Sequence, residues 1–196
     1  MSKQLEIFDR PWIKDTVSSA SDFTFQDKPG AFTWAITIRT ENVGHSVATA
    51  IFPDAKLIAV QGADFIDGPR EQARELCDTL SERFEKLKDN PIVWSNAVFP
   101  NEHLEFPWNV VLLRSQMETN AFDGGKSLGK SVIPMLIGCV EYRYATSEKA
   151  HRTWFVYTLS HTDQPELHLP TQVFFSIGKT VRGANMVLLK SGQFAD

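Results

Sequence analysis

The segment that comes closest to a catalytic motif is residues 124–131, which read GGKSLGKS. Its spacing matches G-x-x-x-x-G-K-[ST], in which backbone amides surround phosphates and the lysine, here Lys130, reaches the outer phosphate groups. This chemistry needs a buried strand directly before the loop and a helix directly after it. Pro134 and the strand-like apolar residues that follow it argue against such a helix. We therefore interpret residues 124–131 as a Gly/Ser/Lys loop between strands and not as a nucleotide site.

The other side chains that could catalyse a reaction or bind a metal form no recognised pattern. The five histidines include neither an HExxH motif nor an i, i+4 pair, so no metal site is predicted. The sequence has no G-x-S-x-G nucleophile elbow, and the acids Glu102 and Glu105 lie in a loop without a pocket signature. A carboxylate pair that meets only in the folded chain is an alternative that spacing cannot detect. The sequence therefore predicts no catalytic residue, cofactor or metal, and favours a protein that is not an enzyme.

The candidate ligand-binding residues are two of the five tryptophans, Trp94 and Trp108. They flank a Pro-containing loop with Pro100 and Pro107, and we expect them to be partly exposed. Packing in the core is the usual role of aromatic side chains. The alternative is an exposed aromatic strip that binds a sugar or a peptide, and Trp94 and Trp108 would then carry it.

The two cysteines, Cys77 and Cys139, are 62 positions apart and form no CxxC pair, which excludes a zinc ribbon or a thioredoxin motif. Cys77 lies in a helical pattern and Cys139 in an apolar run. We expect two buried thiols that pack as small hydrophobic side chains. A disulfide between them is the alternative, and the redox compartment stays open.

Length and composition indicate a single globular domain. The chain has 196 residues, of which 42% are hydrophobic and 22% charged, an ordinary globular composition. The net charge of −4 argues against a nucleic-acid-binding protein, because such proteins carry a basic excess. Residues 1–10 lack the apolar core of a signal peptide. The longest near-apolar run, residues 132–140, is much shorter than the roughly 20 residues of a membrane span, so the chain is expected to be soluble as written.

The hydrophobic pattern predicts mainly β-strands. Residues 32–40 alternate apolar and polar side chains, which indicates a half-buried strand. The Asn42-Val43-Gly44 sequence predicts a turn with positive φ, which would make residues 47–52 an antiparallel neighbour that Pro53 ends. A short strand is expected at residues 57–60. Later strands are expected at residues 109–114, 135–144, 153–159, 173–177 and 185–190, and those at 135–144 and 153–159 are expected to form a long hairpin.

One helix is predicted, over residues 70–88. Its apolar residues recur at steps of three and four, which places them on one stripe, and Pro69 suits the first helical turn. Asp89-Asn90-Pro91 would end it. Strands do not alternate with helices, which argues against a parallel α/β sheet. The pattern predicts an antiparallel β-sandwich or barrel with one inserted amphipathic helix.

Several short segments also carry a resemblance. Residues 10–13 read RPWI, residues 138–142 read GCVEY, residues 151–155 read HRTWF and residues 192–196 read GQFAD. Residues 42–48 are similar to an N-x-G-[KH]-[ST]-P-A turn, with Val47 where proline usually stands. Together they resemble a group of uncharacterised bacterial membrane-anchored proteins, in which an immunoglobulin-like β-sandwich follows N-terminal transmembrane helices.

The resemblance implies an immunoglobulin-like sandwich over residues 10–196 and a juxtamembrane remnant over residues 1–9. It also implies membrane association through a segment absent from this chain, and it supplies no catalytic residues. If the chain is an N-terminally truncated form of a longer protein, the full-length protein is expected to be anchored in a membrane.

Three functions follow from these observations. The first is a non-enzymatic sandwich domain that binds an unknown protein or presents a surface, through loops at one end of the sandwich. The second is a small-molecule or glycan-binding domain that uses exposed aromatic side chains, and the third is an enzyme of unknown class. Free sheet edges also make a homodimer an alternative.

Overall fold

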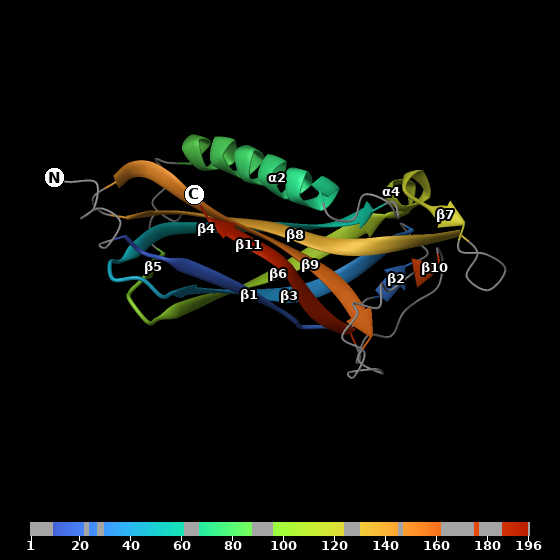
Figure 1. Cartoon of the computed structure of the whole chain (residues 1–196), viewed down its shortest axis with the longest axis horizontal. Coiled ribbons are helices and arrows are strands. Elements are labelled where there is room, and N and C mark those ends of the chain that lie inside the picture. Colours follow the sequence, from blue (N-terminus) through green and yellow to red (C-terminus); the bar gives the residue numbers. More distant parts are fainter. Residues whose placement is uncertain are drawn as a thin grey trace.

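A computed structural model describes residues 10–21, 24–26, 30–60, 67–87, 96–123, 130–144, 147–161, 175–176 and 186–195. These residues form a mainly β structure with two antiparallel sheets and few helices, which confirms the fold class at that level. Figure 1 shows three layers, in which helix α2 (Asp67–Lys86) lies over one sheet and that sheet lies over the other.

The first sheet, here called sheet A, is built around β3 (Ala31–Asn42). The long strand β6 (His103–Leu113) pairs with β3 along nearly its whole length. Consequently β1 (Ile13–Ser19) and β2 (Thr24–Gln26) share the opposite edge of β3. The strand predicted over residues 32–40 is confirmed, because alternate side chains of β3 are buried.

The second sheet, sheet B, has the strand order β11-β9-β8-β4-β5. Its members are β11 (Met186–Ala195), β9 (Ser147–His161), β8 (Lys130–Tyr144), β4 (Ala48–Val60) and β5 (Ala97–Val98). The short strands β7 (Phe122–Asp123) and β10 (Phe175–Ser176) pair with the beginning of β8. The predicted hairpin of residues 135–144 and 153–159 is confirmed as β8 and β9.

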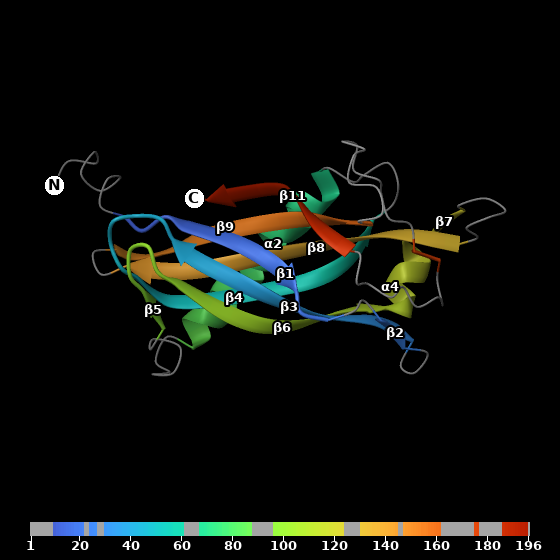
Figure 2. The same ribbon diagram turned by 90° about the horizontal axis from the view of Figure 1, so that it is seen from below.

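The core between the two sheets is made by the inward-facing side chains of each strand. Figure 2 shows sheet A in front of sheet B in the view from below. Phe32, Ile36 and Ile38 of β3 belong to the same apolar cluster as Leu136 and other residues of sheet B, and all four are fully buried. This apolar cluster spans both sheets, so its burial holds them together.

Helix α2 covers the outer face of sheet B, where Leu80 of the helix and Ile137 of β8 belong to a second apolar cluster. The helix predicted over residues 70–88 is confirmed within a few residues at each end. The expectation of two free thiols is wrong, because Cys77 of α2 and Cys139 of β8 form a disulfide. Both positions face the helix–sheet layer, with Cα atoms 5.4 Å apart, and linear spacing could not show that they meet.

The predicted pairing of residues 32–40 with residues 47–52 is wrong. β3 belongs to sheet A and β4 to sheet B, so the chain crosses between the sheets at residues 43–47. Asn42 and Gly44 are not among the described residues with positive φ, which are Gly30, Ala50 and Asn101. Gly44 is instead required for close approach, because a Cβ there would lie 2.3 Å from the backbone nitrogen of Trp12.

Pro53 does not end its strand, and β4 continues to Val60. In an antiparallel pair, the N–H and C=O of one residue point together either toward the partner strand or away from it. Pro53 pairs with Val140, and Ala59 pairs with Pro134 in the same register. Proline has no N–H, so these pairs suit positions whose backbone groups point away from the partner.

The same alternation therefore directs the backbone groups of Ala55 and Ala59 toward the outer edge of β4. The carbonyl of Ala55 supports this, because it accepts a hydrogen bond from the indole of Trp108 on β6, at 3.1 Å. At the other edge of β8, pairing with β9 begins at Met135, directly after Pro134. Proline is thus tolerated in both strands where the ladder needs no donor.

A short helix that was not predicted, α4 (Arg114–Thr119), follows β6 directly. The side-chain oxygen of Gln116 accepts a hydrogen bond from the backbone N–H of Leu113, at 3.0 Å. This bond satisfies a donor at the first turn of the helix. Met117 is the fully buried side chain of α4 and fixes it against the sandwich core.

Candidate functional site

The structure describes one of the two tryptophans proposed as ligand-binding residues. Trp108 is half-buried on β6, packs against the core and donates its indole N–H to the Ala55 carbonyl. Its partial exposure agrees with the sequence analysis, and ligand binding by Trp108 stays a prediction. Trp94 lies outside the described residues.

The end of the phosphate-loop-like segment is part of a strand. Lys130 and Ser131 begin β8 and pair with β7, whereas a phosphate loop would continue into a helix. Residues 124–129 lie outside the described residues. The described residues that follow the segment therefore agree with its interpretation as a loop between strands.

The histidine side chains that the structure describes do not come together into a site. His151 lies beside the rings of Tyr142 and Tyr144, with ring centroids 5.8 and 5.0 Å away. His103 is exposed next to Glu105, at 4.0 Å. Within the described part of the chain, no three His, Cys, Asp or Glu side chains are placed to hold a metal ion.

A buried carboxyl that the sequence analysis did not single out lies beneath α2. Glu141 on β8 is fully buried and accepts a hydrogen bond from the hydroxyl of Ser81 on α2. Burial raises the pKa of Glu141 above its usual value, although the Ser81 hydrogen bond and the positive charges of Arg152 and Arg143 oppose this rise.

Ion pairs between the helix and sheet B surround Glu141. Arg152 pairs with Asp78 at 2.7 Å, and Arg143 pairs with Glu85. Between Asp78 and Glu85 on the helix, Arg83 pairs with Asp54 of β4, at 2.7 Å. This cluster therefore attaches the helix to the sheet, and we assign it no catalytic role.

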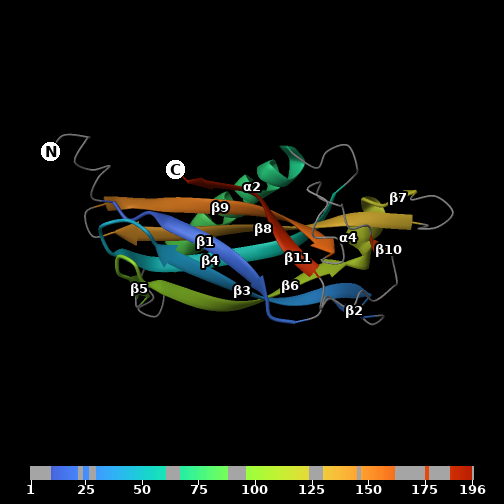
Figure 3. The same cartoon turned by 60° about the horizontal axis from the view of Figure 1, so that its bottom comes forward.

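Exposed apolar side chains gather at one end of the sandwich. Of the five large apolar side chains that are exposed among the described residues, Trp12, Val43 and Phe99 lie at this end. We call these three residues the apolar tip. In Figure 3 it is the end that holds the beginning of β1 and the strand β5.

Backbone hydrogen bonds join the three segments of the apolar tip. The N–H of Val43 donates to the carbonyl of Trp12 at 2.8 Å, and the N–H of Asn101 donates to the carbonyl of Asn42, also at 2.8 Å. The side-chain amide of Asn42 donates to the carbonyls of Ser46 and Val98. The three exposed side chains are therefore carried by a fixed backbone and not by independent loops.

A cationic side chain lies against the apolar tip. The guanidinium carbon of Arg10 is 3.8 Å from the ring centroid of Trp12, a cation–π contact. The surrounding charges are mixed, because Glu102 is exposed in the adjoining turn and Glu41 is half-buried at the end of β3. The tip is therefore an apolar surface with charges of both signs at its rim.

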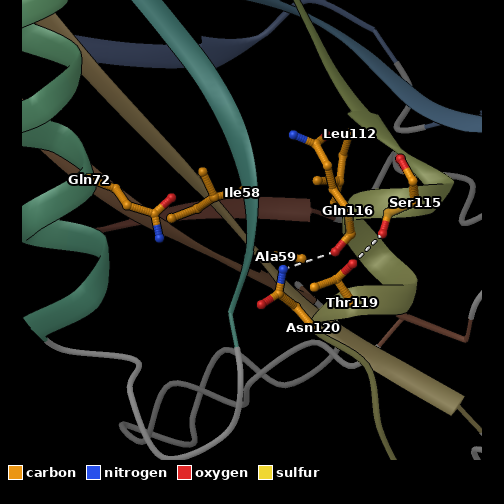
Figure 4. A pocket seen from close by; sticks show the side chains of 8 residues that line it. All are labelled: Ile58, Ala59, Gln72, Leu112, Ser115, Gln116, Thr119 and Asn120. Carbon is orange, nitrogen blue, oxygen red and sulfur yellow. Dashed lines mark hydrogen bonds between the residues drawn. The ribbon is translucent and has the colours of Figure 1, made fainter.

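The opposite end of the sandwich carries a pocket of about 310 Å³, here called the edge pocket. It lies where the end of β4 passes between α2 and α4, as Figure 4 shows. Ile58, Ala59 and Leu112 supply buried apolar surface. The other described side chains of the lining are uncharged and polar, and they are Gln72 of α2, Ser115, Gln116 and Thr119 of α4, and Asn120.

Sequence reasoning missed both the apolar tip and the edge pocket, because each combines residues that are far apart in the chain. The tip joins residues 12, 43 and 99, and the pocket joins residues 58–59, 72 and 112–120. For the tip a partial signal was present, since the RPWI and NVGHSVA segments were both singled out. For the pocket no pattern in the sequence distinguishes the glutamines and the asparagine from ordinary surface residues.

In the described part of the chain, no helix is both long and apolar enough to cross a membrane. Comparisons of the chain with protein-family models, curated proteins and solved structures found no match in any of the three.

Proposed function

We propose that this chain is a non-enzymatic β-sandwich module that binds a second protein through its apolar tip. The observation that carries the proposal is that Trp12, Val43 and Phe99 are exposed together at one end of the sandwich. Isolated exposed apolar side chains are normal, but a group of them on a fixed backbone is typical of an interaction surface. Loops at the end of a rigid sandwich are also a usual place for binding.

The chemistry of the tip favours a protein partner over a lipid surface. Tryptophan and arginine are enriched among the residues that dominate binding energy in protein interfaces, and Arg10 lies directly over Trp12. An anionic lipid surface attracts clusters of basic residues. The exposed Glu102 beside the tip and the net charge of −4 oppose such an attraction.

The proposed setting is a membrane-anchored protein whose sandwich domain is immunoglobulin-like, as the sequence resemblance implies. Residues 1–9 join the described structure at Arg10, so a preceding anchor would hold the apolar tip close to the membrane. The Cys77–Cys139 disulfide favours a location on the oxidising side of that membrane, where disulfides persist.

Photo-crosslinking tests the proposal in the cells that make the protein. The photoreactive residue p-benzoylphenylalanine replaces Phe99 in the full chain, and after irradiation we expect one discrete protein product of larger mass. The matched control carries it at Val111, which is exposed on sheet A toward the other end, and we expect no product there. Val43→Asp in the Phe99 variant should abolish the product, because a desolvated carboxylate costs binding energy.

Three outcomes would overturn the proposal. One is a product that forms equally from both crosslinker positions, and another is a product that survives Val43→Asp. The third is crosslinking only to lipid or only to a second copy of the chain. Intact mass and thermal unfolding of the Val43→Asp variant verify that it is folded.

A further inference from the structure

The edge pocket contains a stretch of strand edge that offers backbone hydrogen bonds. The register of β4 with β8 directs the N–H and C=O of Ala59 away from β8, for the reason given above for Pro134. Strand β5 covers the outer edge of β4 only at Ala48 and Thr49. Trp108 then occupies the edge at Ala55. Four residues farther on, at Ala59, the edge forms part of the pocket wall.

The side chains around this edge are suited to uncharged polar groups. Figure 4 shows Gln72 of α2 on one side of β4, and Gln116 and Asn120 on the other. Asn120 uses its amide nitrogen to donate to the carbonyl of Gln116, at 2.9 Å, and Gln116 uses its side-chain oxygen to accept from Leu113. The amide nitrogen of Gln116 and the amide oxygen of Asn120 keep hydrogen-bonding capacity.

We propose that the edge pocket binds a short, extended and uncharged peptide segment. Its backbone pairs with the N–H and C=O of Ala59, as an added strand does at an open sheet edge. Gln72, Gln116 and Asn120 bind further peptide groups, because a carboxamide side chain offers a donor and an acceptor like those of a peptide group. Ile58 and Leu112 supply apolar surface for its side chains. This proposal does not depend on binding at the apolar tip.

Two features favour a peptide over a saccharide. A strand edge presents one N–H and one C=O from the same residue, and a second extended backbone meets that pair in register. Saccharide sites commonly use an aromatic face for stacking, and the described residues that line the edge pocket include no aromatic side chain. The volume of about 310 Å³ lies at the lower end of the range for ligand pockets, which suits a short segment.

A random linear dodecapeptide library displayed on phage, selected against the full oxidised chain, tests the proposal. The enriched peptides are then measured by fluorescence polarisation against the wild type and three variants. Ala59→Pro removes the outward N–H without removing a bond to β8, and we expect binding to weaken about tenfold, as for one lost hydrogen bond and a blocked edge. Gln72→Ala should weaken binding several-fold.

Gln26→Ala is the matched control, because Gln26 is an exposed glutamine on β2 of sheet A, and it should leave binding unchanged. Gln72→Ala changes a side chain that contacts solvent and should leave the fold intact. If Ala59→Pro fails to fold, the binding measured with Gln72→Ala therefore still tests the proposal. Failure to enrich any peptide, or enriched peptides that bind the Ala59→Pro and Gln72→Ala variants as tightly as the wild type, overturns the proposal. The proposal is also overturned if maltotriose shifts the side-chain amide NMR signals of Gln72 and Asn120 in a titration, because the pocket would then bind a saccharide. Val43→Asp should not alter peptide binding, which separates this site from the apolar tip.

Discussion

The two faces of sheet B are covered by different layers, and the interactions that hold each layer differ in kind. On the face toward sheet A, the contacts are mainly apolar, and Leu136, Val140 and Phe155 are fully buried there. On the face toward α2, an apolar cluster is combined with a disulfide, ion pairs and the buried Glu141. One face of sheet B is thus held mainly by apolar packing, whereas the stability of the other face also depends on a disulfide and on ion pairs.

The largest effect is expected when the disulfide is removed. Closing a loop between residues 62 apart restricts the unfolded chain, and its loss should lower the free energy of unfolding by roughly 4 kcal/mol. The change is Cys77→Ala with Cys139→Ala, measured by urea denaturation. Hydrogen exchange should quicken most in α2 and least in β3 and β6. Dithiothreitol should destabilise the wild type but not the double variant. Equal urea midpoints for the two proteins in the absence of dithiothreitol would contradict the expectation.

A substitution on the face toward sheet A should lower the free energy of unfolding nearly as much as loss of the disulfide does. Reductant should not change the size of this effect. A Cβ at position 138 would lie 2.1 Å from the ring of the fully buried Phe155. Gly138→Ala should therefore lower the free energy of unfolding by about 2 to 3 kcal/mol, since crowding a packed core costs this much. Phe155→Leu should reduce the added cost of Gly138→Ala in a double-mutant cycle. Additive effects of the two substitutions would show that the clash is not the cause.

The pH dependence of the helix face should come partly from Glu141. Its pKa is raised above the usual 4.5 by burial, so the native state holds this proton more tightly than the unfolded state does. This contribution to stability is present below pH 4.5 and is lost as pH rises through the native pKa. Glu141→Gln stays neutral and should gain on the order of 1 kcal/mol over the wild type at pH 8, with convergence near pH 4.

The measurement for Glu141→Gln is thermal or urea unfolding of both proteins between pH 4 and pH 8. Glu82→Gln is the control, because Glu82 is exposed on the same helix and its replacement makes the same chemical change without altering a buried group. Stability curves of Glu141→Gln and the wild type that run parallel across this range would contradict the expected contribution.

The smallest effect is expected from the ion pair between Arg83 and Asp54. The Arg83 side chain is about half exposed, and exposed ion pairs contribute little. Arg83→Ala should lower the free energy of unfolding by about 0.5 kcal/mol at low salt, with much of the effect lost in 1 M NaCl because of screening. A double-mutant cycle with Asp54→Asn measures the pair itself, and a coupling that is independent of salt would rule out an electrostatic origin.

Local elements were predictable because their patterns repeat within short windows. The alternation in β3, the three-to-four spacing in α2 and the β8–β9 hairpin are all properties of adjacent residues. The disulfide and the separation of β3 and β4 into two sheets depend on contacts between distant residues, which periodicity does not encode. Pro53 was misleading for the same reason, because proline breaks a strand only where the ladder needs its N–H.

Little of the candidate sites could be predicted. Trp108 was singled out, but it does not line the edge pocket; it is half-buried on β6 and donates a hydrogen bond to the carbonyl of Ala55. Gln72, Gln116 and Asn120 come together only through the packing of α2 and α4 beside β4, and each is an ordinary polar residue of its helix or turn in the sequence. The apolar tip likewise depends on the crossing of the chain from sheet A to sheet B at residues 43–47.

The covalent link between α2 and β8 also determines how the molecule responds to mechanical load. The loop it closes contains β6, a main strand of sheet A, as well as β5 and the beginning of β8. When the chain is pulled by its two ends, tension passes through the sulfur bridge and not through the residues between Cys77 and Cys139. The oxidised protein should therefore extend about 210 Å less than the reduced one at full stretch, a difference that single-molecule force spectroscopy can resolve.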